Sequence, residues 1–166
     1  MAGFCRLRGR EFEAAIPHFK VILDERPEDL AAWEGMRQAA EGLGRPIDLA
    51  IACAELGALS VDDARGAAFW ETAGLALLEH TDAHEDAEIA LDRAFARDAR
   101  ASKAFDKLFR RVRERKEHKR LITLIDRRLE VCDDEKEIGK LFWERARTLQ
   151  ALGDHDGALA ALENVT

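Results

Sequence analysis

The chain has 166 residues, of which 47% are hydrophobic and 36% charged, and its formal net charge is -7. This length and composition suit one compact domain or a short array of repeats, and the excess of helix-favouring Ala, Leu, Glu and Arg over β-branched runs predicts an all-α fold. No apolar h-region of a signal peptide is visible, and the most apolar stretch, residues 47–61, includes charged side chains and is too short to span a bilayer, so we expect a soluble, cytoplasmic protein.

A recurring segment predicts the second helix of each of a series of hairpins. It opens with a turn, and it then places an Ala four residues before a large apolar residue. The pairs are Ala15 and Phe19 in residues 10–19, Ala87 and Leu91 in residues 82–91, and Ala158 and Leu162 in residues 153–162. Residues 44–53 and 116–125 fit the same frame. The matching positions recur every 34 to 38 residues, which is the length of a helix–turn–helix unit.

Ahead of each segment from the second onward lies a stripe of apolar residues at helical spacing. The stripes are Trp33, Met36, Ala40; Trp70, Ala73, Leu77; Phe105, Leu108, Val112; and Phe142, Ala146, Leu149. Such spacing predicts one buried face per helix. Helix starts are expected after Asp29 and Asp62, because Asp is a preferred N-cap. The predicted hairpins are 1–29, 30–63, 64–100, 101–137 and 138–166, and the first begins midway through its first helix.

These residues resemble the tetratricopeptide repeat family over essentially the whole chain. The positions that carry the resemblance are Ala15, Phe19, Pro27, Trp33, Ala87, Ala94, Gly153 and Ala158. The resemblance implies a right-handed α-solenoid of about five hairpins, in which the first helices line a concave groove and which binds proteins. Two hairpins close with Ala99 and Asp133 where the family has Pro, and the first helices of hairpins three and five are expected to be longer than usual.

No catalytic or metal site is expected from the sequence, and no cofactor. Three widely spaced cysteines form no CxxC pair, so we expect buried thiols in a reducing compartment. His80 and His84 have the i, i+4 spacing of zinc ligands, but the predicted turn lies between them. Ser60 and Ser102, the two serines, lie outside any GxSxG motif. These observations predict a protein that is not an enzyme.

The expected partner-binding residues lie on the first helices of hairpins four and five. An aromatic side chain between cations is a receptor for an acidic peptide, since guanidinium groups pair with carboxylates while the ring packs beside them. Trp143 is expected to face the groove because Phe142 already fills the packing position; the alternative is a Trp packed on the neighbouring hairpin. The predicted site consists of Lys103, Arg110, Arg113, Lys140, Trp143 and Arg147.

The sequence is also compatible with other functions. Residues 97–128 contain 13 Lys and Arg against 5 Asp and Glu, which is typical of a partner surface or of a solvated helix face. The run at 110–120 could neutralise phosphates, so nucleic-acid binding is the alternative function, although Glu114 and Glu117 interrupt the run. The chain could also be a structural arm of a larger protein. Ala158, Leu159, Leu162 and Val165 would leave an apolar face uncovered, which favours self-association or a longer array.

Overall fold

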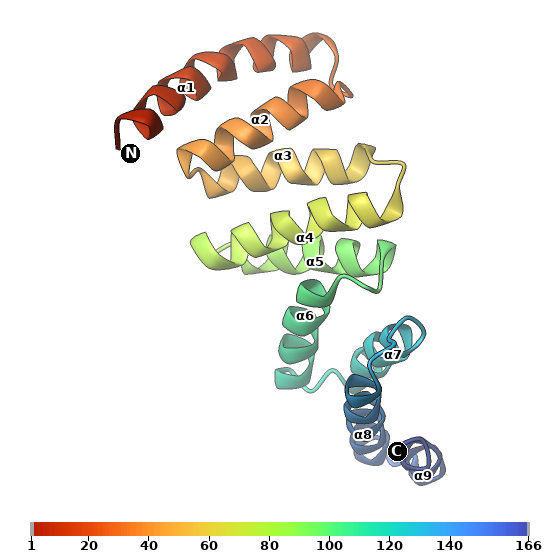
Figure 1. Cartoon of the computed structure of the whole chain (residues 1–166). Helices are drawn as coiled ribbons and strands as arrows, with labels where there is room; N and C mark the ends of the chain where they lie inside the picture. The colour runs from red at the N-terminus through yellow and green to blue at the C-terminus, as the bar shows by residue number, and fades with distance from the viewer. Residues whose placement is uncertain (1, 166) are drawn as a thin grey trace. The chain divides into compact units, whose positions relative to one another are not determined.

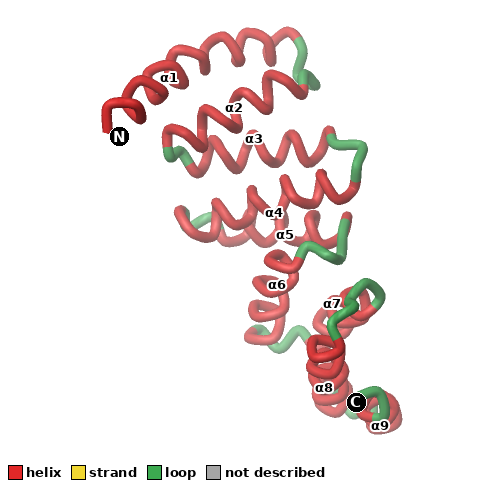
Figure 2. Tube along the Cα trace, viewed as in Figure 1, coloured by secondary structure: helices red, strands yellow, loops and turns green. Residues whose placement is uncertain are grey.

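The fold consists of short antiparallel helices that follow one another along the chain. In this computed structural model, which describes residues 2–165 and the side chains from residue 11 on, every regular element is a helix (Figures 1 and 2). The all-α prediction is confirmed. The helices are α1 (Ala2–Glu25), α2 (Leu30–Leu43), α3 (Pro46–Leu59), α4 (Asp63–His80), α5 (His84–Arg97), α6 (Ser102–Glu114), α7 (His118–Leu129), α8 (Glu135–Ala151) and α9 (His155–Leu162).

The first helix differs from the expectation. Residues 1–29 contain the single helix α1, which continues through Gly9 without the predicted turn, whereas two helices lie in or mainly in each later predicted hairpin. A lone helical glycine costs about 1 kcal/mol relative to Ala, which is too little to end a helix by itself. Pro17 also lies inside α1, where it removes the hydrogen bond to the carbonyl of Glu13. α1 curves along its length in Figure 1.

Helix starts follow the sequence closely. Asp29 and Asp62 accept hydrogen bonds from the amides of Ala32 and Arg65, which confirms both as N-caps. The first helices of hairpins three and five, α4 and α8, have 18 and 17 residues, against 14 in α2 and 13 in α6, and the expectation of longer helices is therefore also confirmed.

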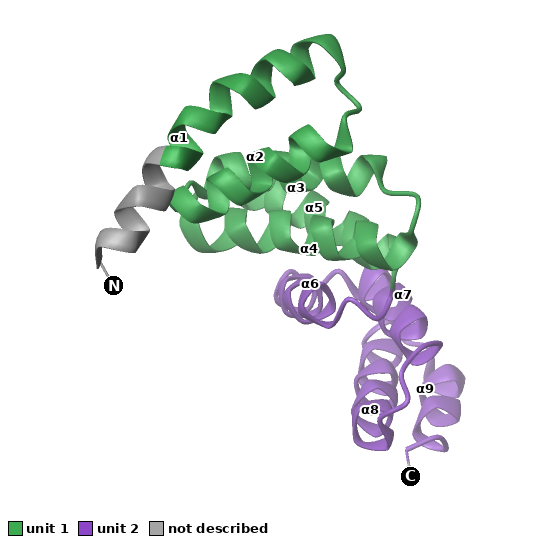
Figure 3. Cartoon of the chain, turned by 45° about the horizontal axis from the view of Figure 1, so that its top comes forward, with its two compact units in different colours: residues 1–98 green, residues 99–166 purple. Residues whose placement is uncertain are grey.

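The chain forms two compact units, residues 1–98 and residues 99–166 (Figure 3). In the first unit, consecutive helices approach closely where a small residue faces a large one. The indole of Trp70 lies against Gly57, and Leu91 lies against Gly74. A side chain at either glycine would push the helices apart, so these glycines set the spacing of α3, α4 and α5. Phe95, Leu56 and Leu91 are the largest fully buried side chains in this unit.

Arg97, the last residue of α5, contacts both sides of the turn between α3 and α4. Its guanidinium donates to the carbonyls of Gly57 and Ser60, near the end of α3, and pairs with Asp63 at the start of α4. Carbonyls in the last turn of a helix have no partner within the helix, so a guanidinium from a later helix satisfies them.

In the second unit, helices α6 to α9 surround buried Phe105, Leu108, Val112, Leu121, Leu124, Ile125, Leu141, Ala146, Leu149, Ala158 and Ala161. The turn between α6 and α7 places Lys116 at φ 58°, a left-handed conformation that lets the chain reverse between the two helices. On α9, Leu159 and Leu162 are 62% and 46% exposed, and Val165 beyond its end is 39% exposed. The apolar face expected there is therefore largely uncovered within the described residues.

Candidate partner-binding hollow

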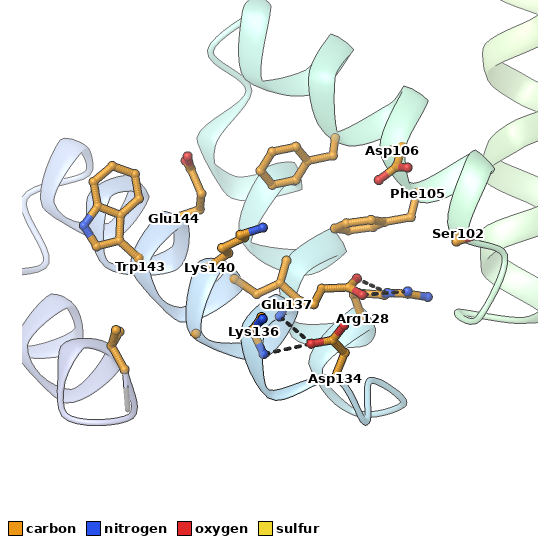
Figure 4. Close-up of a pocket in the computed structure, with 14 residues that line it drawn as sticks. Ser102, Phe105, Asp106, Arg128, Asp134, Lys136, Glu137, Lys140, Trp143 and Glu144 are labelled. Atoms are coloured by element: carbon orange, nitrogen blue, oxygen red, sulfur yellow. Dashed lines mark hydrogen bonds and ion pairs between the residues drawn. The ribbon is translucent and has the colours of Figure 1, made fainter.

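A hollow of about 840 Å³ lies within the second unit (Figure 4). Helices α6 and α8 supply most of its lining, and Arg128 from α7 and Val165 complete it. Its size falls in the range of surface pockets that hold a ligand or part of a peptide. The full lining is Ser102, Phe105, Asp106, Phe109, Arg128, Asp134, Lys136, Glu137, Gly139, Lys140, Leu141, Trp143, Glu144 and Val165.

The apolar part of the lining combines a fixed base with an accessible ring. Phe105 and Leu141 are buried, and the ring centroids of Phe105 and Phe109 are 5.4 Å apart, which fixes Phe109 beside them. Trp143 is 47% exposed although it lines the hollow. A large aromatic ring that keeps half its surface in water is available to pack against a partner.

Glu144 forms ion pairs with two arginines of the predicted site. The Nη1 atoms of Arg113 and Arg147 each lie 3.5 Å from its carboxylate. The guanidinium of Arg147 also lies 4.7 Å from the centre of the Trp143 ring, and that of Arg113 lies 5.5 Å from the centre of the Phe109 ring. The two arginines therefore hold rings at the edge of the hollow through cation–π contacts, and their charge is partly neutralised by the chain itself.

A second ion pair, between Arg128 and Glu137, lies in the lining. Nε of Arg128 lies 2.7 Å from Glu137, and its Nη1 donates to the carbonyl of Ala99. The hydrogen bond from Arg128 lowers the pKa of Glu137 from its usual 4.5, and the same bond raises that of Arg128. Asp134 accepts from the amides of Lys136 and Glu137 at the start of α8. Three charged groups of the lining are thus occupied by structural contacts.

Two lysines of the lining have no ion-pair partner among the described residues. Lys136 and Lys140 are exposed on the first turns of α8 and line the hollow, and Lys140 extends toward its middle in Figure 4. Asp106 is the one lining carboxylate for which the described contacts show neither an ion pair nor a capping bond. The lining as a whole carries three basic and four acidic side chains, so its feature is not a net charge but two ammonium groups without an ion-pair partner beside an apolar base.

The structure brings part of the predicted site together. Lys140 and Trp143 line the hollow, and Arg113 and Arg147 meet beside it at Glu144. Lys103 and Arg110 are exposed on α6 but do not line the hollow. Trp143 is 47% exposed and lies in the lining between α6 and α8.

Several lining residues were not selected from the sequence. Phe109 follows Phe105 by four residues, a spacing that places both rings on one face of α6. Glu144 stands three residues before Arg147, which is the spacing of a helical ion pair. The partnership of Arg128 with Glu137 joins different helices, and no local spacing indicates it.

The basic run at 110–120 is divided by the turn between α6 and α7. Glu117 pairs with both Arg115 and Arg120, and Arg113 pairs with Glu144. Phosphate binding depends on cations that release counterions, and ion pairs within the protein reduce that gain. The stacking aromatics near this run, Phe109 and Trp143, face the hollow on α6 and α8.

Within the described side chains, no group of three His, Cys, Asp or Glu residues is arranged to hold a metal ion. His80 ends α4 and His84 begins α5, so the turn expected between them is present. None of the helices in residues 2–165 combines the length and the apolar character needed to cross a membrane.

The cysteines fulfil the expectation of burial only in part. Cys53 is fully buried, and desolvation raises the pKa of its thiol to about 11. Cys132 is half-exposed, in the turn after α7, so the expectation of burial is wrong for it. Cys5 lies outside the described side chains.

Comparison with known proteins identifies the fold. No protein-family model and no curated protein sequence matches the chain. Two crystal structures of MamA align with 96% of it at 19% and 20% identity, cover 89% and 83% of the MamA chains, and have TM-scores of 0.49 and 0.50. The thermophilic TPR protein TTC0263 of Thermus thermophilus aligns with 93% of the chain and 81% of its own at 19% identity and a TM-score of 0.39.

At such low identities the similarity shows the fold alone. It rests on the MamA structure that aligns with a TM-score of 0.50. The recurring segments, the helix pairs and this likeness agree with one another. In fold, the chain is a tetratricopeptide-like helical-repeat protein, as its sequence predicted.

Proposed function

We propose that the chain is a non-catalytic scaffold that binds a segment of a partner protein in the hollow of its second unit. The observation that carries this proposal is the half-exposed ring of Trp143 at the rim of an apolar base formed by Phe105, Phe109 and Leu141. Binding hot spots are enriched in Trp, Tyr and Arg and lie in pockets that exclude water. A partner would place an apolar side chain against these rings.

The charges of the hollow support a partner that carries carboxylates. Lys136 and Lys140 have no ion-pair partner among the described residues, whereas Glu137 and Glu144 are already bound to arginines. A carboxylate on the partner therefore meets two available ammonium groups without displacing a pair. The acidic character of the partner rests on the lysines and not on Arg113 and Arg147, which were part of the predicted receptor.

The experiment is affinity capture from a lysate of the source cell, with and without nuclease, by the intact chain and two variants. Trp143→Gln removes the ring from the hollow. Leu159→Gln is the matched control, since Leu159 is 62% exposed in the same unit but does not line the hollow. We expect nuclease-resistant capture of particular proteins that Trp143→Gln loses and Leu159→Gln retains. Equal capture by all three proteins would contradict the proposed site.

A second pair of variants tests the charge of the partner. Lys136→Gln with Lys140→Gln removes two charges from the hollow, and Lys107→Gln with Lys119→Gln removes two exposed charges outside its lining. A carboxylate-bearing partner is weakened by the first pair and not by the second. Capture that disappears with nuclease treatment would instead support nucleic-acid binding through residues 110–120.

A further inference from the structure

A second groove, unrelated to the hollow, lies in the first unit. Helices α3 and α5 form its walls and α4 forms its base, and its volume is about 600 Å³. Because the turns between these helices are short, α3 and α5 run in the same direction on either side of α4. The base is the stripe Trp70, Ala73 and Leu77, whose i, i+3, i+7 spacing keeps one face of α4 along the groove.

The walls expose apolar side chains where a solvated helix would carry polar ones. Ile47 and Ile51 on α3 are 57% and 52% exposed, and Ile89 on α5 is 51% exposed. On α3 the stripe continues through Ala54 and Ala58, so the apolar line extends over the 12 residues 47–58, or about 16 Å at the helical rise. That length corresponds to three turns of a second helix laid along it.

Because many side chains of the lining are small, the groove has room for a whole helix. Ala54, Ala58, Ala73, Ala83 and Ala90 all line it. Two helices pack with their axes 8–10 Å apart when the side chains at the contact are small, with the ridges of one in the grooves of the other. The isoleucines then flank the bound helix, which is the arrangement of a helix-in-groove complex.

One end of the groove is strongly acidic. Asp86 lines it, and Asp48, Asp82 and Glu85 lie within four residues of other lining residues on the same helices and turn. Within the described residues, none of these four carboxylates forms an ion pair with Lys, Arg or His. The ends of α3, α4 and α5 that meet there add about half a positive charge in sum, which is small beside four formal negative charges.

At the other end of the groove, Arg93 of α5 covers the ring of Trp70. The guanidinium of Arg93 lies 4.6 Å from the centre of that ring. A cation already occupies the aromatic face at this end, so a basic side chain of a partner has its favourable position at the acidic end. Glu55 on α3 also lines the groove, so the lining itself holds two carboxylates and one cation, and the excess of negative charge comes from the carboxylates at the Asp86 end.

We propose that this groove binds an amphipathic helix of a partner protein, with Leu-like residues along one face and Lys or Arg toward the acidic end. Helix α9 of a second copy of this chain is a poor occupant. The exposed leucines of α9 are Leu159 and Leu162, and they are flanked by Asp156 and Glu163, which the acidic end would repel. Charge complementarity thus selects a basic helix from another protein.

The probe is a synthetic 18-residue amphipathic peptide with Leu at helical spacing on one face and Lys elsewhere, labelled with fluorescein. Its control is the same peptide with Glu in place of every Lys. Titration with the intact chain, followed by fluorescence anisotropy, gives both dissociation constants. We expect the Lys peptide to bind at least tenfold more tightly than the Glu peptide.

Two matched pairs of variants separate the groove from general attraction to an acidic protein. Ile51→Gln with Ile89→Gln should weaken the Lys peptide at least tenfold, whereas Val21→Gln, at a residue that is 60% exposed on α1, should leave it unchanged. Glu85→Gln with Asp86→Asn should weaken it several-fold, and Asp24→Asn with Glu28→Gln, which changes the net charge equally, should have a smaller effect. Circular dichroism verifies that each variant is folded.

Three results would overturn the proposal. The first is equal affinity for the Lys and Glu peptides, and the second is equal weakening by both members of either matched pair. The third is a dimer in analytical ultracentrifugation that Ile51→Gln with Ile89→Gln dissociates, because the groove would then belong to a second copy. None of these measurements involves Trp143 or Lys140, so their outcome is independent of the hollow in the second unit.

Discussion

Replacing Gly74 with Ala tests whether helix propensity or the close approach of α4 and α5 dominates at this position. In an exposed helix, Ala is more stable than Gly by about 1 kcal/mol. At Gly74 the new Cβ would lie 2.7 Å from Cγ of Leu91 and 3.0 Å from the carbonyl oxygen of Ala87. Neither atom is the end of a flexible side chain, so the two helices must separate.

The magnitude follows from these two opposing effects. Overpacking a core costs about 1–3 kcal/mol, and a clash that includes a backbone atom belongs to the upper part of that range. After the gain in propensity is subtracted, we expect Gly74→Ala to lower the free energy of unfolding of the first unit by about 1–2 kcal/mol. Thr72→Ala, on the exposed side of α4, is the control and should be neutral or slightly stabilising.

Native-state hydrogen exchange of peptides from α4 and α5 measures this unit separately from the rest of the chain. A double-mutant cycle with Leu91→Ala adds a second test. Leu91→Ala alone leaves a cavity, which the methyl group introduced by Gly74→Ala partly fills, so the double variant should be more stable, by about 1 kcal/mol or more, than the sum of the single effects predicts. Stabilisation by Gly74→Ala, or an additive cycle, would refute the reasoning.

Three further outcomes are expected. Arg97→Met removes the bonds to Gly57 and Ser60 and should destabilise the first unit by about 1–3 kcal/mol, with faster exchange of amides 57–66, whereas Lys20→Met should not. The lowered pKa of Glu137 means that its pair with Arg128 stabilises the fold above pH 4.5 and loses this effect as the pH falls through the folded pKa, so the difference in unfolding free energy between wild type and Glu137→Gln should shrink in acid; a constant difference would contradict it. Cys53 should resist iodoacetamide at pH 8 in the native chain and react after denaturation, as peptide mass spectrometry can show, because burial raises its pKa to about 11.

The helical hairpins were predictable from the sequence because the features that form them are local. Asp29 and Asp62 begin helices through bonds to amides three residues ahead, and the apolar stripe through Trp70 and Leu77 depends only on the helical period. The turn expected within the first 29 residues was wrong for a related reason. The segment at 10–19 matches the recurring pattern, but a glycine without a second turn-forming residue does not end a helix.

The candidate site was predictable only where one helix supplies the residues. Trp143 and Lys140 lie one turn apart on α8, and both line the hollow. Lys103 and Arg110 were placed by the same helical reasoning, but the hollow follows the face of α6 that carries Phe105 and Phe109. The pairing of Arg113 with Glu144 joins α6 to α8, and such a contact depends on how two helices pack, which the period of either helix does not encode.

The arginine at the end of α5 bears on how this array could be divided or rearranged. Arg97 satisfies carbonyls near the end of α3, and Arg128 near the end of α7 does the same for Ala99, which follows α5. The second helices α5 and α7 therefore each complete the turn that precedes their own hairpin, so the stabilising contacts extend one turn beyond the hairpin that supplies the arginine. In a chain built of nearest-neighbour interactions, such an overlap raises cooperativity between repeats. Repeats exchanged or deleted at hairpin boundaries would separate these arginines from their carbonyls, whereas boundaries moved one helix along would keep them together.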